Sequence, residues 1–261
     1  MFISIVITVK NEAENIADLL DSLVVQEKPF EILVIDANSD DGTQEIVKEY
    51  EKKHEEIKLI VHEGTRGESR NFGVENARGD IIAFIDGDCI ANPFWLKEIR
   101  KKINEGYEVV AGKTVNLGYK HFKDLQRVEL EYKGYDTTYP SCNLAYTKSL
   151  FKKIGGFDDR FITGEDIDLN LRAIDAGARI AYNEKAIVYH RIRSTFRDFI
   201  RQAFWNGYGR KQLTLKHGKL WKQYSAKKMF QTQFTFWGLM RLLFGLLGYV
   251  SCKISGGGLK T

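Results

Sequence analysis

The chain has 261 residues, of which 43% are hydrophobic, enough for the core of one large domain or two small ones. Its cysteines (Cys89, Cys142, Cys252) have neither paired nor metal-type spacing, which argues against a disulfide scaffold and for a reducing compartment. The net charge of +4 hides an asymmetry: residues 191–261 hold 14 Lys/Arg and one acid, or +13, whereas residues 1–190 carry −9. This basic segment favours an anionic partner.

The first half of the chain alternates short apolar runs with helical periodicities. The run Ile3–Val9 lacks a preceding basic stretch and is therefore predicted as a first strand, not as a signal peptide. The elements predicted after it are a helix at 12–25, a strand at 31–35, a helix at 43–53, a strand at 58–62, a helix at 68–77 and a strand at 81–85. This order predicts an α/β fold with a doubly wound, mostly parallel central sheet flanked by helices, in which ligands bind beyond the carboxyl ends of the strands.

The later segments give weaker signals. They predict a helix from 93 to about 105, a strand at 109–112, a helix at 122–132, a loop at 139–141, helices at 147–154 and 165–176, and strands at 180–182 and 186–189. After these comes a basic, aromatic stretch and then the apolar run 234–250, with Arg241 near its middle. A transmembrane helix needs about 20 apolar residues, and a central Arg costs roughly 2.5–3.5 kcal/mol. A helix in the membrane interface is favoured, with insertion or a dimer interface as alternatives.

The sequence Asp86-Gly87-Asp88 directly follows the strand predicted at 81–85. Two carboxylates this close repel each other unless a cation or a proton lies between them. Hard divalent cations prefer oxygen ligands and commonly bridge to substrate phosphates. The pair therefore predicts a metal and phosphate site, with a calcium or turn site of no catalytic role as the alternative.

Other charged residues stand at the ends of predicted elements. Asp36 ends the second strand, where it can accept from a nucleotide base or ribose, although a helix-capping loop explains its neighbours equally well. Arg66 and Arg70 open the third helix, where they can neutralise a diphosphate, although surface arginines are common. His190 follows a strand, and imidazole is compatible with Mn²⁺ in a mixed shell.

Gly164-Glu165-Asp166 precedes the helix predicted at 165–176. The helix dipole and the free N–H groups favour carboxylates at this position, which is sufficient to explain an acid there. The alternative is a general base, because a carboxylate can accept the proton of a hydroxyl that attacks an activated carbon. The sequence leaves both interpretations open.

In this order the segments resemble the inverting family-two glycosyltransferases with the GT-A fold, over about residues 2–190. The motifs that carry the resemblance are Ser4–Glu12, where Thr8 stands in place of a frequent Pro, Asp36 with its loop, the D-x-D sequence Asp86-Gly87-Asp88, Ser141–Tyr146 followed by Gly155–Asp158, Glu165-Asp166 and His190. Trp205 ends a segment that is faintly similar to the Q-x-x-R-W signature of processive synthases, with a different residue order.

The resemblance implies a catalytic domain at 1–190, with a nucleotide-binding half to about 112 and an acceptor half at 113–190, followed by a basic amphipathic helical tail at 191–261. It implies transfer from a UDP- or GDP-sugar with Mn²⁺ or Mg²⁺ as cofactor. The implied residues are Asp166 as the catalytic base, Thr8, Val9, Glu12, Asp36, Asn38, Arg66, Arg70, Asp86, Gly87 and Asp88 for the donor, Asp86, Asp88 and His190 for the metal, and Asn143, Glu165 and Trp205 on the acceptor side.

The basic tail and the apolar run predict a peripheral enzyme on the cytoplasmic face of an anionic membrane, acting on a lipid-linked or saccharide acceptor. A homodimer through the apolar run is an alternative, and no motif supports nucleic-acid binding. Three other functions stay open. One is a haloacid-dehalogenase-like phosphatase, whose aspartates would lie on the first strand, and another is a sugar-nucleotide pyrophosphorylase, which would have a Gly-rich basic loop after that strand. The third is an inactive nucleotide-sugar-binding protein.

Overall fold

The computed structural model describes residues 1–118, 125, 127–192, 195–218, 220, 224, 227, 229 and 233–256. The chain divides into two compact units that interleave along the sequence. Unit 1 comprises residues 1–115, 139–157 and 173–190, and unit 2 comprises residues 116–138, 158–172 and 191–261. The sequence predicts instead two regions, each continuous along the chain, that meet at residue 190. That division stays a prediction.

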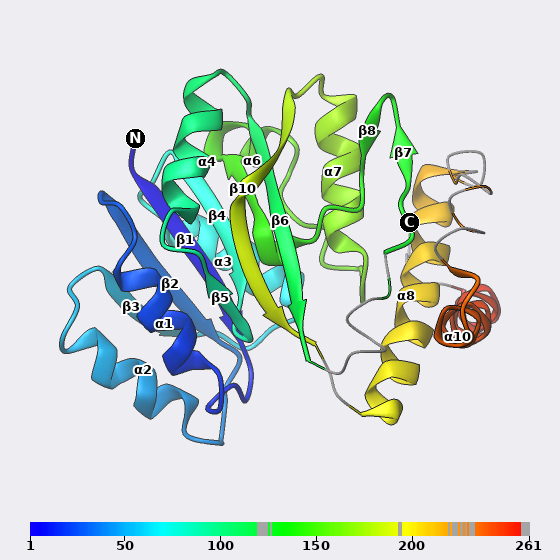
Figure 1. Cartoon of the computed structure of the whole chain (residues 1–261), viewed down its shortest axis with the longest axis horizontal. Coiled ribbons are helices and arrows are strands. Elements are labelled where there is room, and N and C mark those ends of the chain that lie inside the picture. Colours follow the sequence, from blue (N-terminus) through cyan, green and yellow to red (C-terminus); the bar gives the residue numbers. More distant parts are fainter. Residues whose placement is uncertain are drawn as a thin grey trace. The chain divides into compact units, whose positions relative to one another are not determined.

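Unit 1 is built on an eight-stranded sheet of order β3-β2-β1-β4-β9-β6-β10-β5 (Figure 1). The strands are β1 (Ile3–Val9), β2 (Phe30–Asp36), β3 (Ile57–Val61), β4 (Ile81–Asp86), β5 (Cys89–Ala91), β6 (Val109–Leu117), β9 (Leu144–Thr147) and β10 (Ile180–Arg191). Strands β3, β2, β1 and β4 are parallel, whereas β9 is antiparallel to β4 and β6, and β5 is antiparallel to β10. The predicted α/β fold is confirmed.

Helices pack on both faces of this sheet because alternate strand residues point to opposite sides. The helices are α1 (Ile16–Val24), α2 (Thr43–Glu51), α3 (Arg66–Asn76), α4 (Trp95–Asn104), the 3-10 turn η1 (Ser141–Asn143) and α6 (Lys148–Lys153). Ile5 and Ile7 of β1 share one core with apolar residues of α1, α2 and α4. Val6, between them, faces Gly73 of α3, where a Cβ would lie 3.2 Å from Ile35 Cγ1. The sheet is therefore doubly wound, and the ends of its parallel strands lie between two layers of helices.

Unit 2 includes a short hairpin and helices. Its elements are β7 (Glu131–Tyr132), β8 (Tyr135–Asp136), α7 (Glu165–Asp175), within which the unit boundary falls, α8 (Phe196–His217) and α10 (Phe236–Ile254). Helices α8 and α10 (yellow to red in Figure 1) touch through glycines: a Cβ on Gly207 would overlap the carbonyl oxygen of Gly245, and one on Gly248 that of Phe204. Glycine therefore lets the two backbones approach closely.

Three sequence predictions differ from the structure. The short strands at 180–182 and 186–189 are one strand, β10, because Asn183 is buried and satisfied by the carbonyl and carboxylate oxygens of Glu98, both 3.1 Å away. The helix at 122–132 is wrong in its described part, where residues 127–130 are irregular and β7 follows; residues 122–124 and 126 lie outside the described residues. Strands β5 and β9 were not predicted, because each is a short run next to a motif.

Candidate active site

The carboxyl ends of β1, β2 and β4 bring the predicted donor residues together. In the sheet register Thr8 is paired with Asp86, and Val9 with Asp36. Gly87 then lies so close to the first strand that a Cβ on it would be 2.9 Å from Val9 Cγ1 and 3.0 Å from Glu12 Cγ. A side chain at position 87 would therefore push the loop away from β1.

Asp86 is held by an arginine from the facing helix. Arg70 is 1% exposed, and its Nη2 donates to Asp86 Oδ1 at 2.8 Å, while its guanidinium lies 5.3 Å from the centre of the Phe157 ring. Burial raises the pKa of Asp86, but the positive charges of Arg70, Arg66 and His190 outweigh it and the net pKa is lowered. Asp86 is therefore a fixed, ionised carboxylate that points at α3.

The α3 N-terminus that positions these arginines is encoded locally. The Thr65 hydroxyl accepts from Glu68 N at 3.3 Å, and the Glu68 carboxylate accepts from Thr65 N at 2.6 Å, which is a capping box. Arg66 is exposed in the first helical turn, one turn before the buried Arg70. The two arginines thus differ in their surroundings: Arg70 is part of the packed structure, whereas Arg66 is at the surface.

Asp88, Cys89 and His190 form the second part of the site. His190 is opposite Cys89 in the β5–β10 ladder, and its Nε2 is 3.4 Å from Asp88 Oδ2. Among the residues that the structure describes, these three have ligand atoms that all lie within 4.8 Å of one another. Asp86, predicted as a metal ligand, is not in this cluster, and Cys89 enters it without having been predicted. Its only sequence signal is its position next to Asp88.

The donor set fits a divalent cation through its oxygen and nitrogen atoms. Burial lowers the pKa of His190, but the hydrogen bond with Asp88 and the nearby negative charges raise it more strongly, to about 9, so binding of a metal ion by His190 would release a proton from the ring. The contact with Cys142, together with burial, raises the pKa of the Cys89 thiol, so the sulfur stays protonated. A carboxylate and an imidazole beside a neutral thiol suit Mn²⁺ or Mg²⁺ better than a thiolate-binding metal.

The loops that follow β1 and β2 are joined to each other by hydrogen bonds beside this cluster. Asn11 N donates to Ser39 Oγ at 2.8 Å, and Asp40 N donates to Asn11 Oδ1 at 3.1 Å. Asp36 is fully buried and accepts from Ser39 N at 2.9 Å and from Gln44 Nε2 at 2.7 Å. These hydrogen bonds tie the loop after β2 to Asp36 and to the loop after β1, and Asn38 at its tip is exposed, in the left-handed region with φ +60°.

Glu12 is a fourth acid on the donor side. Burial raises its pKa, a hydrogen bond from Asn15 lowers it, and the charges of Asp88 and Asp86 raise it again, so that the net shift is upward. The shift is due mainly to burial, with a smaller contribution from the negative charges of Asp88 and Asp86. A bound cation would relieve this repulsion.

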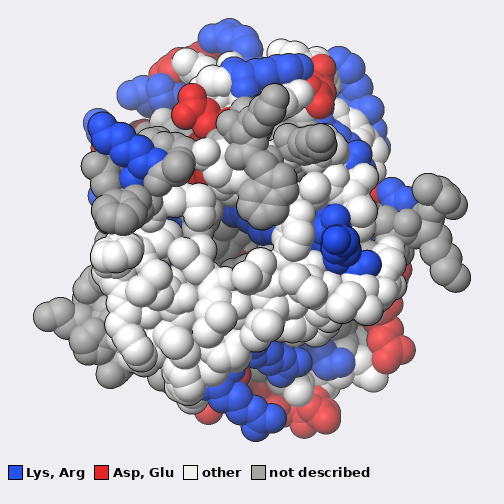
Figure 2. Space-filling model, turned by 90° about the vertical axis from the view of Figure 1, so that its right-hand side faces the viewer, with Lys and Arg blue, Asp and Glu red and all other residues white. Residues whose placement is uncertain are grey.

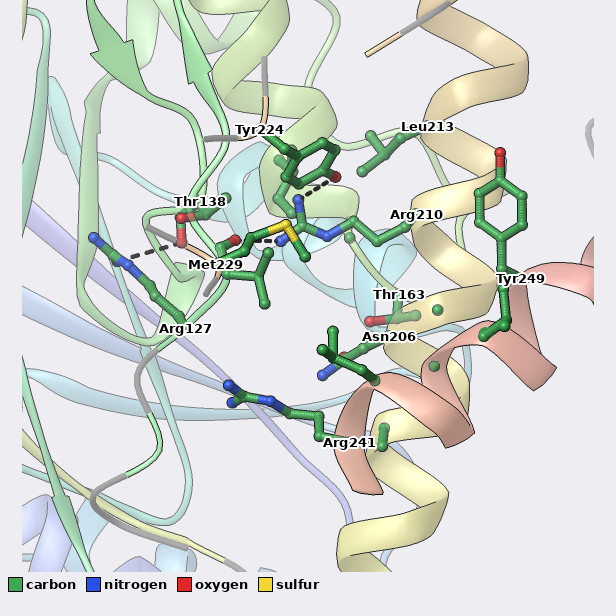
Figure 3. A pocket seen from close by; sticks show the side chains of 18 of the residues that line it. Arg127, Thr138, Thr163, Asn206, Arg210, Leu213, Tyr224, Met229, Arg241 and Tyr249 are labelled. Atoms are coloured by element: carbon green, nitrogen blue, oxygen red, sulfur yellow. Dashed lines mark hydrogen bonds between the residues drawn. The ribbon is translucent and has the colours of Figure 1, made fainter. Parts of the chain in front are cut away.

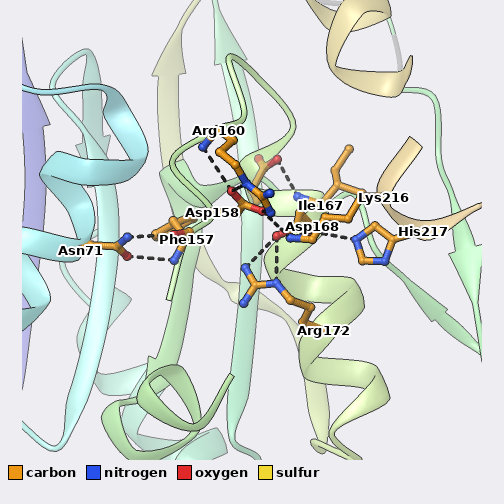
Figure 4. A network of polar contacts seen from close by, with 10 residues as sticks. Asn71, Phe157, Asp158, Arg160, Ile167, Asp168, Arg172, Lys216 and His217 are labelled. Carbon is orange, nitrogen blue, oxygen red and sulfur yellow. Dashed lines mark hydrogen bonds and ion pairs between the residues drawn. The ribbon is translucent and has the colours of Figure 1, made fainter. Parts of the chain in front are cut away.

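Asp166 and Glu165 lie in the first turn of α7 in unit 2. Asp166 Oδ1 accepts from Ile167 N at 2.8 Å, and its side chain lines a cavity of about 440 Å³ that α8 and α10 also border. Glu165 is buried. Asp168, two residues later in the chain, forms ion pairs with Arg172, Lys216 and His217 and so has a structural role (Figure 4). Asp168 is therefore a structural carboxylate, whereas Asp166 faces a cavity.

The remaining acceptor-side predictions fall on packed residues. Asn143 is 1% exposed: its Oδ1 accepts from Trp95 Nε1 at 2.9 Å and its Nδ2 donates to the carbonyls of Lys113 and Ala186. Trp205 of α8 is half-buried with its ring against Tyr208. These contacts explain both residues by packing, and their acceptor roles stay predictions.

With this geometry established, comparison with known proteins decides the family. The Glycosyl transferase family 2 model matches residues 4–157, and the Glycosyl transferase family group 2 model matches residues 131–255. The chain belongs to glycosyl transferase family 2. The first match covers most of the parallel part of the sheet, together with Asp86 and Asp88.

Relatives of this family 2 enzyme are themselves named as glycosyltransferases. Glycosyltransferase AglE of Haloferax volcanii is 30% identical over 227 residues, which are 81% of this chain and 74% of that protein. The dolichyl N-acetyl-alpha-D-glucosaminyl phosphate 3-beta-D-2,3-diacetamido-2,3-dideoxy-beta-D-glucuronosyltransferase of Methanococcus voltae is 27% identical, covering 95% of this chain and 84% of its own. Mannosyltransferase PcManGT from Pyrobaculum calidifontis, solved with GDP-Man and Mn²⁺, has the same fold, with a TM-score of 0.64 at 16% identity, over 97% of this chain and 75% of its own.

The family assignment removes alternatives that the sequence left open. A glycosyltransferase is neither a haloacid-dehalogenase-like phosphatase nor a pyrophosphorylase. The recognition of a family-two glycosyltransferase and of its fold is confirmed. The roles of individual residues, the metal, the stereochemistry and the acceptor are matters of proposal.

Proposed function

We propose that this family 2 glycosyltransferase moves a sugar from a UDP- or GDP-sugar to an acceptor with inversion, and that it needs Mn²⁺ or Mg²⁺. The observation that carries the proposal is the cluster of Asp88 and His190 at the carboxyl ends of the strands, next to the Arg70–Asp86 ion pair. A divalent ion held by Asp88 and His190 would offset the charge that builds up on a leaving diphosphate. The complex of the Pyrobaculum calidifontis enzyme with GDP-Man and Mn²⁺ supports both donor class and metal.

The residues of the donor half then have distinct tasks. Asp36 and Asn38 face the nucleoside, and Thr8, Val9 and Glu12 form the wall on the β1 side. Arg66 contacts the diphosphate, and Arg70 keeps Asp86 ionised and oriented toward the ribose. Gly87 keeps the loop close to β1, so that Asp88 stays beside His190.

On the acceptor side, Asp166 is the proposed base. Its carboxylate takes the proton of the acceptor hydroxyl while the hydroxyl oxygen attacks the anomeric carbon from the side opposite the diphosphate, which inverts the configuration. One carboxylate suffices, because a diphosphate leaves without a proton donor, unlike the leaving group in glycoside hydrolysis. The exposure of Asp166 to a cavity supports this role.

The acceptor is lipid-linked, and the enzyme is peripheral on the cytoplasmic face of the membrane. Helix α10 is long and apolar enough to cross a membrane, and only 17% of its most apolar 18-residue stretch is buried within the protein. Figure 2 shows a broad band without charged side chains on the face that the C-terminal helices form, with Lys and Arg along much of its border and Asp and Glu at a few places. An apolar band with a basic border is typical of a helix that lies in an anionic interface. The dolichyl phosphate sugar named for the Methanococcus voltae relative supports this acceptor class.

The donor half of the proposal is tested by nucleoside diphosphate release. A panel of UDP- and GDP-sugars with Mn²⁺ or Mg²⁺ should yield nucleoside diphosphate, and Asp88→Asn should reduce the rate about 100-fold or more, because a carboxylate is lost where charge develops. The matched control, Asp80→Asn, changes an exposed acid before β4 and should leave the rate unchanged. Phosphate release from simple monoesters, without turnover of any sugar nucleotide, would contradict the proposal.

The base is tested separately from donor binding. Asp166→Asn should abolish transfer to an acceptor while the dissociation constant for the donor stays within about twofold, because the amide cannot accept the hydroxyl proton. Donor binding is measured by calorimetry on the same preparation. A loss of donor affinity in this variant would assign Asp166 to the donor site instead.

A further inference from the structure

The cavity in unit 2 combines positive charge with an apolar wall. Its volume is about 440 Å³, within the range of small-molecule sites. Arg210 of α8 and Arg241 of α10 both extend into it (Figure 3). Leu213, Leu242 and Leu246 contribute to its apolar lining.

The two arginines are held by neutral groups. Arg210 donates to the Tyr224 hydroxyl at 2.8 Å and to the carbonyl oxygen of Val128 at 2.9 Å. The Arg241 side chain is hydrogen-bonded to the amide oxygen of Gln233. The partners of Arg210 fix its guanidinium group without cancelling its charge. Arg127, which also lines the cavity, forms an ion pair with Asp136.

The two guanidinium groups repel each other. Burial lowers the pKa of Arg241, and the positive charge of Arg210 lowers it further, to about 10. Bringing two cations into a partly buried cavity costs free energy that a bound anion would recover. Planar guanidinium groups match the oxygens of a phosphate better than ammonium groups do.

The apolar wall of the cavity continues onto the outside of α10. Leu246 lines the cavity and is also 58% exposed. Leu239, Leu243 and Val250 are exposed on the same helix. A hydrocarbon chain that enters along Leu246 would therefore remain in contact with apolar side chains over its whole path. A free inorganic phosphate would leave this wall unused.

We infer that the cavity binds the phosphate of a lipid-phosphate acceptor between Arg210 and Arg241, with the hydrocarbon chain leaving past Leu246. This inference rests on the proposed function, since it names the acceptor of the same transfer reaction. Asp166 lines the same cavity, so a hydroxyl of a sugar carried on that phosphate lies in the compartment that holds the proposed base. The arginines anchor the acceptor and are not catalytic residues.

Binding of farnesyl phosphate to the full chain tests the inference. We expect Arg210→Gln and Arg241→Gln each to weaken binding about tenfold or more, because each removes a charged donor to the phosphate. The matched control, Arg201→Gln, removes an exposed arginine of the same helix α8 that does not line the cavity, and should bind as the native chain does. Calorimetry with farnesol and with inorganic phosphate separates the contributions of chain and anion, and both should bind far more weakly.

Equal affinity of the native chain and both glutamine variants would overturn the inference, as would inorganic phosphate binding as tightly as farnesyl phosphate. If Arg210→Gln unfolds, the inference is tested by comparing Arg241→Gln with Arg241→Lys. The lysine variant keeps the positive charge and should therefore restore part of the affinity for farnesyl phosphate. Nucleoside diphosphate release without acceptor is followed in every variant. It should be unchanged, whereas Asp88→Asn should abolish it and leave farnesyl phosphate binding intact, so the two proposals fail in different assays.

Discussion

Asp168 illustrates what a single buried carboxylate does in this protein. It is fully buried and accepts from His217 Nε2 at 2.7 Å and Arg172 Nε at 2.9 Å, and Lys216 Nζ lies 2.7 Å away. Burial raises its pKa, but the hydrogen bond from His217 and the charges of Arg172 and Lys216 outweigh it, and the net pKa is lowered. The acid therefore ties the start of α7 to the end of α8 (Figure 4).

Replacing this carboxylate should destabilise the protein in a pH-dependent way. Asp168→Asn removes a buried charge that half-buried Arg172, Lys216 and His217 share, and should cost about 3–5 kcal/mol at pH 7. Because the folded pKa is below the unfolded value of about 3.9, this contribution is complete above roughly pH 5 and is lost as the pH falls through the folded pKa. Urea unfolding of both proteins between pH 3 and 8 measures the difference.

The exposed neighbour Asp159 provides the control for that experiment. Asp159→Asn changes the same charge at the surface and should shift stability by less than about 0.5 kcal/mol. A difference between native and Asp168→Asn that stays constant down to pH 3 would mean that the network does not depend on the ionised carboxylate.

At the candidate site, the sequence could predict the position of each acid but not its partner. Asp86 and Asp88 were predicted from the apolar run before them; Asp86 is the last residue of β4, and Asp88 comes two residues later. The ion pair between Asp86 and Arg70 depends on how α3 packs on the sheet. The contact between Cys89 and His190 depends on the antiparallel β5–β10 ladder. Neither follows from local spacing, because both contacts join distant segments.

At the scale of elements, local patterns predicted the first half of the sheet well. The helical spacing of Ile16, Leu19, Leu20 and Leu23 places all four in the core, and Val47 of α2 joins them. The antiparallel half was harder, because β9 is only four residues long and β10 has polar residues at its centre. A strand of this kind is stabilised by its neighbours and not by its own pattern.

The crossing of α8 and α10 gives a prediction with an internal control. A Cβ on Gly248 would overlap the Phe204 carbonyl oxygen, so Gly248→Ala should destabilise the protein by about 1–3 kcal/mol. A Cβ on Gly245 would lie 3.5 Å from the Ala203 carbonyl oxygen, which is an ordinary contact. Gly245→Ala should therefore be neutral or stabilising by up to about 1 kcal/mol, from helix propensity.

Thermal unfolding of the two glycine variants, with near-ultraviolet circular dichroism of the tryptophans, measures this difference. If both alanines are tolerated equally, the helices do not pack through their backbones. If both are equally damaging, the cost arises from the helix itself and not from the crossing.

For the whole molecule, the apolar face of α10 predicts how the protein distributes between water and membrane. Leu243 and Leu247 are 51% and 50% exposed on this helix. The double substitution Leu243→Glu/Leu247→Glu should reduce binding to anionic vesicles about tenfold or more, since burying a charge in the acyl region is costly. Sedimentation with vesicles of phosphatidylcholine and phosphatidylserine measures the bound fraction.

Leu215→Glu is the control, because Leu215 is similarly exposed, at 48%, on α8. It should bind vesicles as the native chain does. Native binding should also weaken as salt rises from 0.05 to 0.5 M, because the basic residues around the apolar band act through screened charges. Vesicle binding that survives the double substitution would assign membrane attachment to another surface.

The interleaving of the two units along the chain has a consequence for synthesis on the ribosome. All segments of unit 1 have been made once residue 190 has been added, whereas unit 2 also needs residues 191–261. At about 5–20 residues per second, these 71 residues take roughly 4–14 s. During this interval residues 116–138 and 158–172 await their partners, among them the segment with the proposed base. The proposed donor half can therefore fold while α8 and α10 are still being made.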